Sequence, residues 1–277
     1  MTDVAIQARA QDINFVTTFE TDLHNMLNVL GHESVQVVAP GTAHKIYKAS
    51  GTLESGAVEE KALIPDSGIK MNDGELVEIT YQKYRKLTSI EEIGKKGYDV
   101  AVGGTNIAML KEIQKNIRKT IFNAVATGTE TAQGATFQAK VAKAAAFLEK
   151  KFEDEAFTPI IFASPDDVYD YLGSHTVTLE TNFGLSYLSN FMGIGNVIVD
   201  SNMAAGTVAG TAAENLVIDA ASITSIPGME LETDELGMIA VHNGAKYENA
   251  ALEVVAYCGL AVLPTYKDRI IKVTSAA

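Results

Sequence analysis

Hydrophobic residues recur at helical spacing between Asp99 and Thr127, in the most regular pattern of the chain. Successive apolar positions lie three or four residues apart, which is typical of an α-helix with one buried side. At about 1.5 Å per residue, the stretch would span roughly 40 Å. Gly103 and Gly104 weaken its first turns, so the secure part of the helix runs from Thr105 to Ala126. We interpret it as a spine with a core-facing line of Ile107, Leu110, Ile113, Ile117 and Ile121, continued by Val125.

The N-terminal segment combines a polar start with a compact helix signature. Residues 1–14 show no periodicity and are expected to form a flexible arm. Thr17 to Glu20 fit a capping box, and Gly31 closes the helix. Its apolar face could be buried on its own domain or on another molecule, and deletion of residues 1–31 would distinguish the two. The face consists of Val16, Phe19, Leu23, Met26, Leu27 and Leu30.

Residues 35–88 are predicted to be extended. They contain a long excursion rich in turn residues, including 65–68 and 72–74, and return through Glu78–Lys86 with β-branched, aromatic and charged residues. Two paired strands alone are marginally stable in water. We therefore expect this ribbon to lean on another molecule, although a hairpin lying over its own domain remains possible.

After the spine the pattern changes to alternating strands and helices. Gly128 stands where a helix C-cap glycine belongs, and a second amphipathic helix runs from Phe137 to Phe152. Ser164 and Pro165 have the residue types of an N-cap and a first helical position. Strands are predicted at 158–163, 196–200, 214–219 and 247–263, the last broken near Gly259, with an edge strand at 269–273.

The charge is unevenly distributed along the chain of 277 residues. Residues 1–151 balance 18 basic against 18 acidic residues, whereas residues 152–277 hold 4 basic against 17 acidic ones, which is the whole net charge of −13. Such an acidic half disfavours tight binding of nucleic acid. The single cysteine, Cys258, excludes intrachain disulfides, and no signal peptide or membrane-spanning run is found, so a reducing cytoplasm is expected.

No catalytic, cofactor or metal constellation is recognisable. The five histidines are scattered, and the carboxylates Asp166, Asp167 and Asp170 are explained by their place at a helix start. Glu232, Asp234 and Glu235 could bind a cation, but a solvated acidic loop is the simpler interpretation. The sequence gives no support for an enzyme.

The order of arm, ribbon, spine helix and α/β region, together with several sequence phrases, resembles the major capsid proteins of tailed bacteriophages, which have the Hong Kong ninety-seven-type fold. The phrases are distributed over most of the chain, at 79–87, 110–118, 164–173, 183–188 and 197–202. The resemblance implies an α+β fold with four parts. These are an N-arm (1–34), an E-loop ribbon with flanking strands (35–88), a P-domain with the spine helix (89–135 plus 264–277) and an α/β A-domain (136–263).

The resemblance also implies a function and partners. Such proteins self-assemble, as pentamers and hexamers, into the icosahedral shell of the virion in the bacterial host cytoplasm. The shell encloses DNA without sequence-specific binding and without a membrane, and a separate scaffolding protein and a portal are expected. Lys–Asn crosslinks join subunits in some relatives, but nothing local identifies a partner Asn. The subunit-contact candidates are Phe19, Leu23, Leu27, Tyr47, Lys61, Lys70, Tyr81 and Tyr84.

Two other functions stay open. An encapsulin-type compartment shell uses the same fold around cargo enzymes. A soluble α/β enzyme with an unrecognised site is the alternative from a different class.

Overall fold

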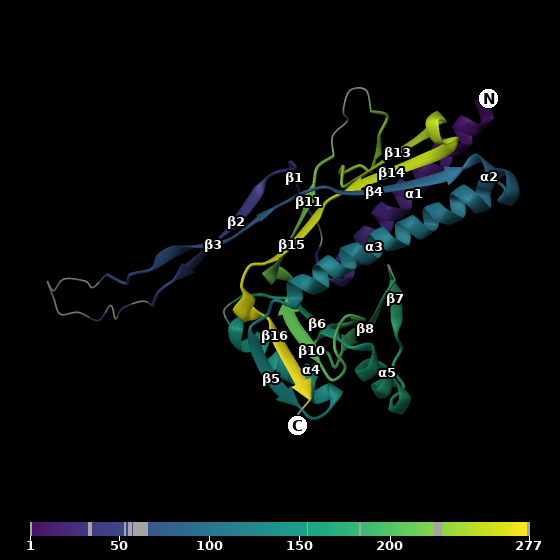
Figure 1. The fold of residues 1–277 in the computed structure, drawn as a ribbon. Coiled ribbons are helices and arrows are strands. Elements are labelled where there is room, and N and C mark those ends of the chain that lie inside the picture. Colours follow the sequence, from purple (N-terminus) through teal and green to yellow (C-terminus); the bar gives the residue numbers. More distant parts are fainter. Residues whose placement is uncertain are drawn as a thin grey trace.

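The structure, a computed structural model, describes residues 2–32, 35–52, 54, 57, 66–153, 155–182, 184–223 and 229–275. Two lobes and a projecting ribbon make up the molecule (Figure 1). The spine lobe contains three helices and two small sheets, and the seven-stranded lobe contains the largest sheet with two helices. No helix among these residues is both long and apolar enough to span a bilayer.

The spine lobe is built around two long helices. Its helices are α1 (Thr2–Val29), α2 (Ile90–Lys96) and α3 (Gly104–Val125), with a π-helical segment at Asp99–Gly103 just before α3. The four-stranded antiparallel sheet has the order β12 (Glu232–Thr233), β13 (Ile239–Lys246), β14 (Ala251–Cys258) and β4 (Gln82–Ser89). The three-stranded sheet has the order β1 (Gln36–Val38), β11 (Leu216–Ala221) and β15 (Leu260–Pro264).

The seven-stranded lobe holds the second half of the fold. Its sheet order is β5 (Glu130–Gly134), β16 (Ile271–Ser275), β10 (Val208–Ala212), β6 (Pro159–Ala163), β9 (Gly195–Val199), β8 (Leu185–Phe191) and β7 (Glu180–Asn182). Helix α4 (Phe137–Lys151) packs on β10 and β16, and α5 (Pro165–Ser174) follows β6. Short 3₁₀ turns lie at Ala213–Asn215, Tyr247–Asn249 and Lys267–Arg269.

The ribbon consists of β2 (Ala43–Ser50) and β3 (Lys70–Glu78), paired antiparallel and extending away from both lobes (Figure 1). The two-stranded ribbon is thus confirmed, but its return limb is shorter than expected. Residues 82–89 form β4, which pairs with β14 in the spine lobe. Residues 72–74, expected as a turn, lie within β3.

The largest core lies between α1, α3 and the strands that cover them. Phe19, Leu23 and Met26 of α1 are buried in the same cluster as Ile113 and Ile121 of α3. A second cluster fills the seven-stranded lobe between its sheet and the helices α4 and α5, with Val141, Ile161 and Val197 fully buried. The apolar side of α1 is therefore buried inside its own subunit.

Three expectations about the chain's organisation are wrong. Residues 2–14 are not an irregular arm, because α1 begins at Thr2. The C-terminal strand belongs neither to a sheet edge nor to the spine region, because β16 lies between β5 and β10 in the seven-stranded sheet. Conversely, residues 216–263 contribute β11, β13, β14 and β15 to the spine lobe, where α3 contacts β15. The positions of β16 and of the strands in 216–263 are both set by pairing between strands that are far apart in the sequence.

Candidate functional site

One face of the ribbon exposes three hydrophobic side chains to solvent, beside the charged Lys45. The strand register pairs Lys45 with Leu76 and Tyr47 with Asp73, with a bulge between Lys45 and Tyr47. Directly opposite residues of an antiparallel pair point to the same face, and so do alternate residues along one strand. Tyr47, Met71 and Leu76 therefore share a face, and they are 55%, 65% and 62% exposed.

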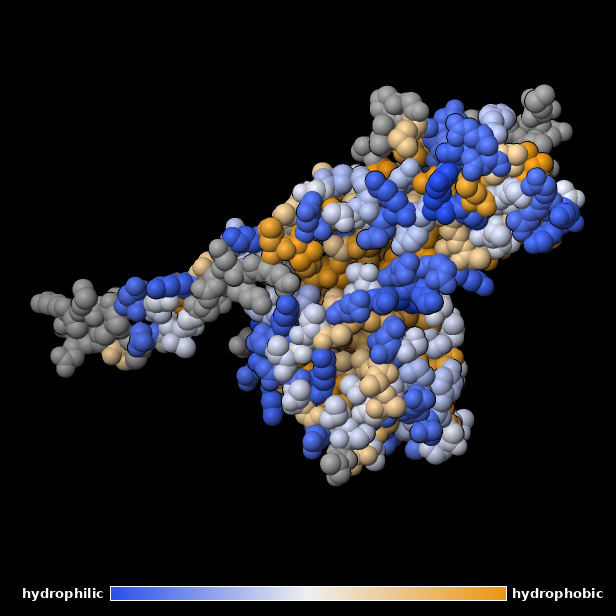
Figure 2. All heavy atoms as spheres, viewed as in Figure 1, coloured by the Kyte–Doolittle hydropathy of each residue, from blue (hydrophilic) through white to orange (hydrophobic). Residues whose placement is uncertain are grey.

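These three side chains are exposed because, within the described part of the chain, no second layer of structure packs on the ribbon. In Figure 2 it is a thin projection, and hydrophobic residues gather on the body over β11 and β15, where the ribbon begins. The Lys45 ammonium lies 5.4 Å from the centre of the Tyr47 ring, which holds a cation against the apolar face. Exposed hydrophobic side chains on a two-stranded ribbon with nothing packed against it are typical of a surface that another molecule covers.

The apolar face of the N-terminal helix is not such a surface. Phe19, Leu23 and Leu27, predicted as subunit contacts, are buried at 2% exposure or less inside the subunit. They pack in the main core with α3 and the surrounding strands. Their assignment as contacts between subunits is wrong, because α1 covers its own spine helix.

The remaining contact candidates differ from one another. Tyr81 donates a hydrogen bond from its hydroxyl to the Ser222 carbonyl at 2.7 Å, and Tyr84 is partly buried against the main core. Both rings are therefore engaged within the subunit. Lys70 is exposed at the start of β3, and Lys61 lies outside the described residues.

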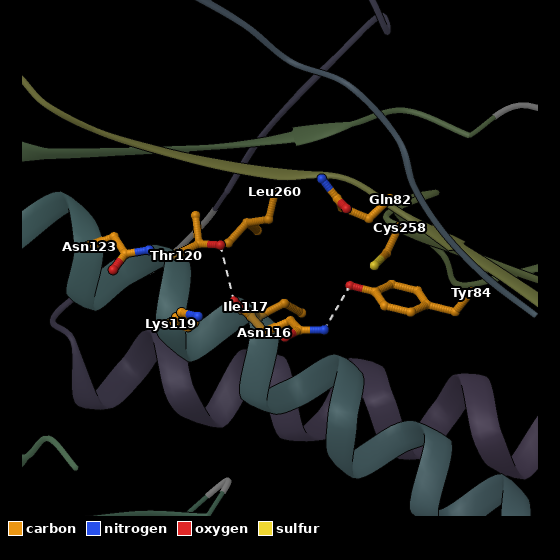
Figure 3. Close-up of a pocket in the computed structure, with 9 residues that line it drawn as sticks. All are labelled: Gln82, Tyr84, Asn116, Ile117, Lys119, Thr120, Asn123, Cys258 and Leu260. Atoms are coloured by element: carbon orange, nitrogen blue, oxygen red, sulfur yellow. Dashed lines mark hydrogen bonds between the residues drawn. The ribbon is translucent and has the colours of Figure 1, made fainter. Parts of the chain in front are cut away.

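A groove of about 320 Å³ runs between α3 and the strands β4, β14 and β15 (Figure 3). Asn116 donates its side-chain amide to the Tyr84 hydroxyl at 3.3 Å, and Thr120 donates to the Asn116 carbonyl at 3.1 Å. Burial raises the pKa of the Tyr84 phenol and raises the pKa of the Cys258 thiol to about 12. Both groups are neutral at physiological pH, so the groove offers hydrogen bonds and apolar surface rather than a nucleophile.

Four of the five residues expected to face the core from the spine helix are buried. Leu110, Ile113, Ile117 and Ile121 are buried, but Ile107 is 57% exposed. The buried position in that turn is Asn106, four residues before Leu110, and its side-chain oxygen accepts a hydrogen bond from Lys86 Nζ at 2.5 Å. The apolar pattern led to Ile107 because the residue that is buried in this turn, Asn106, is polar and does not appear in such a pattern.

Lys86 fastens β4 to the start of the spine helix. Its ammonium also donates to the Thr105 hydroxyl at 2.6 Å and to the Val102 carbonyl at 3.2 Å. The Val102 carbonyl belongs to the π-helical segment, where regular helical hydrogen bonding is interrupted. One cation thus satisfies groups on both sides of the junction between the π-helical segment and α3.

The carboxylate of Asp167, at the start of α5, stabilises the fold. Ser164 Oγ caps α5 by accepting from the Asp167 amide at 3.2 Å, as the residue types predict. Asp167 itself receives hydrogen bonds from Lys140 Nζ at 2.5 Å and from the Gly206 amide at 2.7 Å. Burial opposes ionisation of this carboxyl, but the hydrogen bonds from Lys140, Ser164 and Gly206 outweigh it and lower its pKa. Among the described residues, no three His, Cys, Asp or Glu are arranged to hold a metal ion.

A second acidic group lies where α1 meets β12. Glu20, Glu232, Asp234 and Glu235 line a hollow of about 440 Å³. The pKa of Glu20 is raised by burial and then by Asp234 and Glu235, against a lowering by His24. Asp234 has its pKa raised by burial, and its Oδ1 accepts the Ile239 amide at 2.8 Å. The acidic segment is therefore partly packed against α1, and not the solvated loop that was expected.

Solved structures resemble this subunit along most of its length, although no protein-family model and no curated protein matches its sequence. The virus-like particle from Pyrococcus furiosus aligns with a TM-score of 0.57 at 11% identity, over 96% of this chain and 98% of that one. Gordonia phage Cozz aligns at 0.54 and 11% identity, over 91% and 87%. The holo-SrpI encapsulin complex from Synechococcus elongatus PCC 7942 aligns at 0.53 and 8% identity, over 87% and 84%. The chain thus has the Hong Kong ninety-seven-type capsid fold, as its sequence resemblance implied.

Proposed function

We propose that copies of this chain assemble into the icosahedral shell that encloses the genome of a tailed bacteriophage or prophage. The observation that carries the proposal is the exposed ribbon face of Tyr47, Met71 and Leu76, which no other element in the described part of the subunit covers. A thin subunit that reaches its neighbours through such a ribbon can bury area on several copies, where one compact contact offers only about 800 Å² per partner. The capsid fold supports the same conclusion.

In this proposal the ribbon is the E-loop, and Lys70, which pairs with Ser50 at the end of the strands far from the lobes, is a further contact candidate. The spine lobe is the P-domain, and the seven-stranded lobe, including β16, is the A-domain whose copies cluster in pentamers and hexamers. A separate scaffolding protein and a portal complete the assembly in the host cytoplasm. Enclosed DNA needs no sequence-specific contact.

Negative-stain electron microscopy of the purified protein tests the proposal. We expect discrete particles or rings of five and six subunits, in greater number at higher ionic strength, because the acidic residues of neighbouring A-domains repel one another. A subunit that stays monomeric at every salt concentration, with scaffolding protein supplied, would contradict it.

Ribbon variants test whether assembly depends on the exposed face of Tyr47, Met71 and Leu76. The triple variant Tyr47→Ser, Met71→Ser, Leu76→Ser should keep the thermal unfolding midpoint of the dissociated subunit and lose closed particles. Met192→Ser is the matched control, because Met192 is also about half exposed but lies on the seven-stranded lobe. Unchanged particle yield in the triple variant would remove the ribbon from the assembly.

A compartment shell around protein cargo is the second candidate. It is favoured by the alignment with the encapsulin complex. Portal and terminase genes beside this gene would indicate a phage, and a cargo enzyme gene would indicate a compartment. An enzymatic role has no comparable observation in its favour.

A further inference from the structure

The outer face of α2 contains a glycine that the packing of the subunit does not explain. Ile90 is 60% exposed, and Glu91, Gly94 and Lys95 are exposed beside it. At 3.6 residues per turn these four positions adjoin on one side of the helix. A Cβ on Gly94 would meet no atom within 4 Å outside its own helix, although glycine inside a helix is destabilising relative to alanine.

The helix is held firmly in place at the tip of the spine lobe (Figure 1). Ser89 Oγ accepts the Glu92 amide at 3.2 Å, which caps the first turn. The Ile90 amide donates to the Ala250 carbonyl at 2.9 Å, and the Gly97 amide donates to the Ile93 carbonyl at 2.8 Å. The exposed face is therefore preformed and does not need to be ordered on binding.

The charges on this face are complementary to themselves. Glu91 lies in the first turn and Lys95 in the last turn of α2. Glu92 is paired with Lys96 at 2.7 Å, whereas neither Glu91 nor Lys95 has an ion pair within the part of the chain that the structure describes. A second copy turned by 180° would place its Lys95 opposite Glu91 and its Glu91 opposite Lys95, as in an isologous contact.

We propose that α2 binds α2 of a second copy of this chain, antiparallel across a two-fold axis. The axis passes at position 93, midway between Glu91 and Lys95, so Gly94 lies next to the crossing point, where the absence of a side chain lets the two backbones approach closely. The Ile90 side chains flank the crossing, and the two Glu91–Lys95 pairs set the orientation. This inference rests on the proposed shell, in which rings of subunits need additional contacts to join one another.

Charge exchange tests the contact, with closed particles counted after size-exclusion chromatography. Glu91→Lys and Lys95→Glu should each lower the yield about tenfold, and the double variant should restore it, because the exchanged pairs re-form across the axis. Gly94→Ala should lower the yield as well, while raising the unfolding temperature of the dissociated subunit. Glu112→Lys, an exposed reversal on α3, is the control. Undiminished yield in the single variants, or no recovery in the double variant, overturns the proposal and leaves the shell function standing.

Covalent trapping tests the same contact without a shell. Gly94→Cys subunits should form a dimer under mild oxidation, because the crossing brings two copies of position 94 within disulfide range. Cys258 is the only other thiol and is buried, so the unmodified chain is a clean reference. Glu112→Cys should remain monomeric. If Gly94→Cys dimerises no faster than Glu112→Cys, the two-fold contact is wrong, whereas trapping without particles would contradict only the shell.

Discussion

The ammonium of Lys140 lies 2.5 Å from the carboxylate of Asp167 inside the seven-stranded lobe, with only 3% of the lysine side chain exposed. The Lys140 ammonium also donates to the Gly206 carbonyl at 3.0 Å. The pair thereby joins α4, the start of α5 and the loop before β10. A single buried ion pair connects three elements that are distant in the sequence.

Removal of one member of this pair should be costly. Lys140→Met leaves the Asp167 carboxylate buried without its cation, so we expect a loss of about 3–5 kcal/mol in the free energy of unfolding. Urea denaturation of the dissociated subunit measures it. The double variant Lys140→Met, Asp167→Asn should be more stable than the single one. Lys150→Met, exposed on the same helix, should stay within about 0.5 kcal/mol of the wild type.

The N-terminal helix should behave as part of the subunit core. Deletion of residues 1–31 removes Phe19, Leu23 and Met26 from the main core, so we expect a chain without cooperative unfolding. Deletion of residues 1–13 spares these core residues and should leave a cooperative transition. Circular dichroism with thermal melting distinguishes the two, and a stable fold after the longer deletion would show that α1 is dispensable.

Local sequence signals predicted local structure well. Ser164 and Pro165 stand at the N-cap and first position of α5, and the break near Gly259 separates β14 from β15. At Gly259 a Cβ would come within 2.8 Å of the Thr80 carbonyl oxygen, a long-range contact that the sequence does not show. Helix capping, by contrast, is satisfied by neighbours in the chain. Patterns of this kind need little knowledge of the tertiary fold.

Features that depend on distant pairing were predicted poorly. The sequence does not indicate that β16 inserts between β5 and β10, or that α1 finds its cover on α3. The ribbon face was only partly predicted, because residues 72–74 look like a turn but lie within β3, which brings Met71 and Leu76 to the side of Tyr47. Simple alternation would not have found them, because Met71 and Leu76 are five residues apart and only the shifted register brings both to one face.

Gly128 is not the C-cap of α3 that its sequence position predicted, because the C-cap is Ala126; Gly128 is needed for space and not for a left-handed backbone. A Cβ at this position would come within 2.6 Å of Ile270 Cγ2 and 2.9 Å of its carbonyl oxygen. We expect Gly128→Ala to destabilise the subunit by about 1–3 kcal/mol, as overpacking does. Gly173→Ala, with no atom within 4 Å, is the control and should be neutral or stabilising. Equal unfolding midpoints for the two variants would refute the crowding at Gly128.

The hollow between α1 and β12 should make stability depend on pH through Glu20. Burial and the carboxylates of Asp234 and Glu235 raise the pKa of Glu20 above its ordinary value of 4.5, with His24 acting in the opposite direction. The folded subunit therefore binds this proton more readily than the unfolded chain. As the pH falls from 7 toward the raised pKa, the wild type should gain stability relative to Glu20→Gln, and the gain should level off below about pH 4.5, where the unfolded chain is protonated as well. Unfolding free energies of both proteins between pH 7 and 4 measure the difference, with Glu149→Gln on the exposed side of α4 as the control. If the Glu20→Gln curve runs parallel to that of the wild type throughout this range, the carboxylates do not couple α1 to the β12 segment.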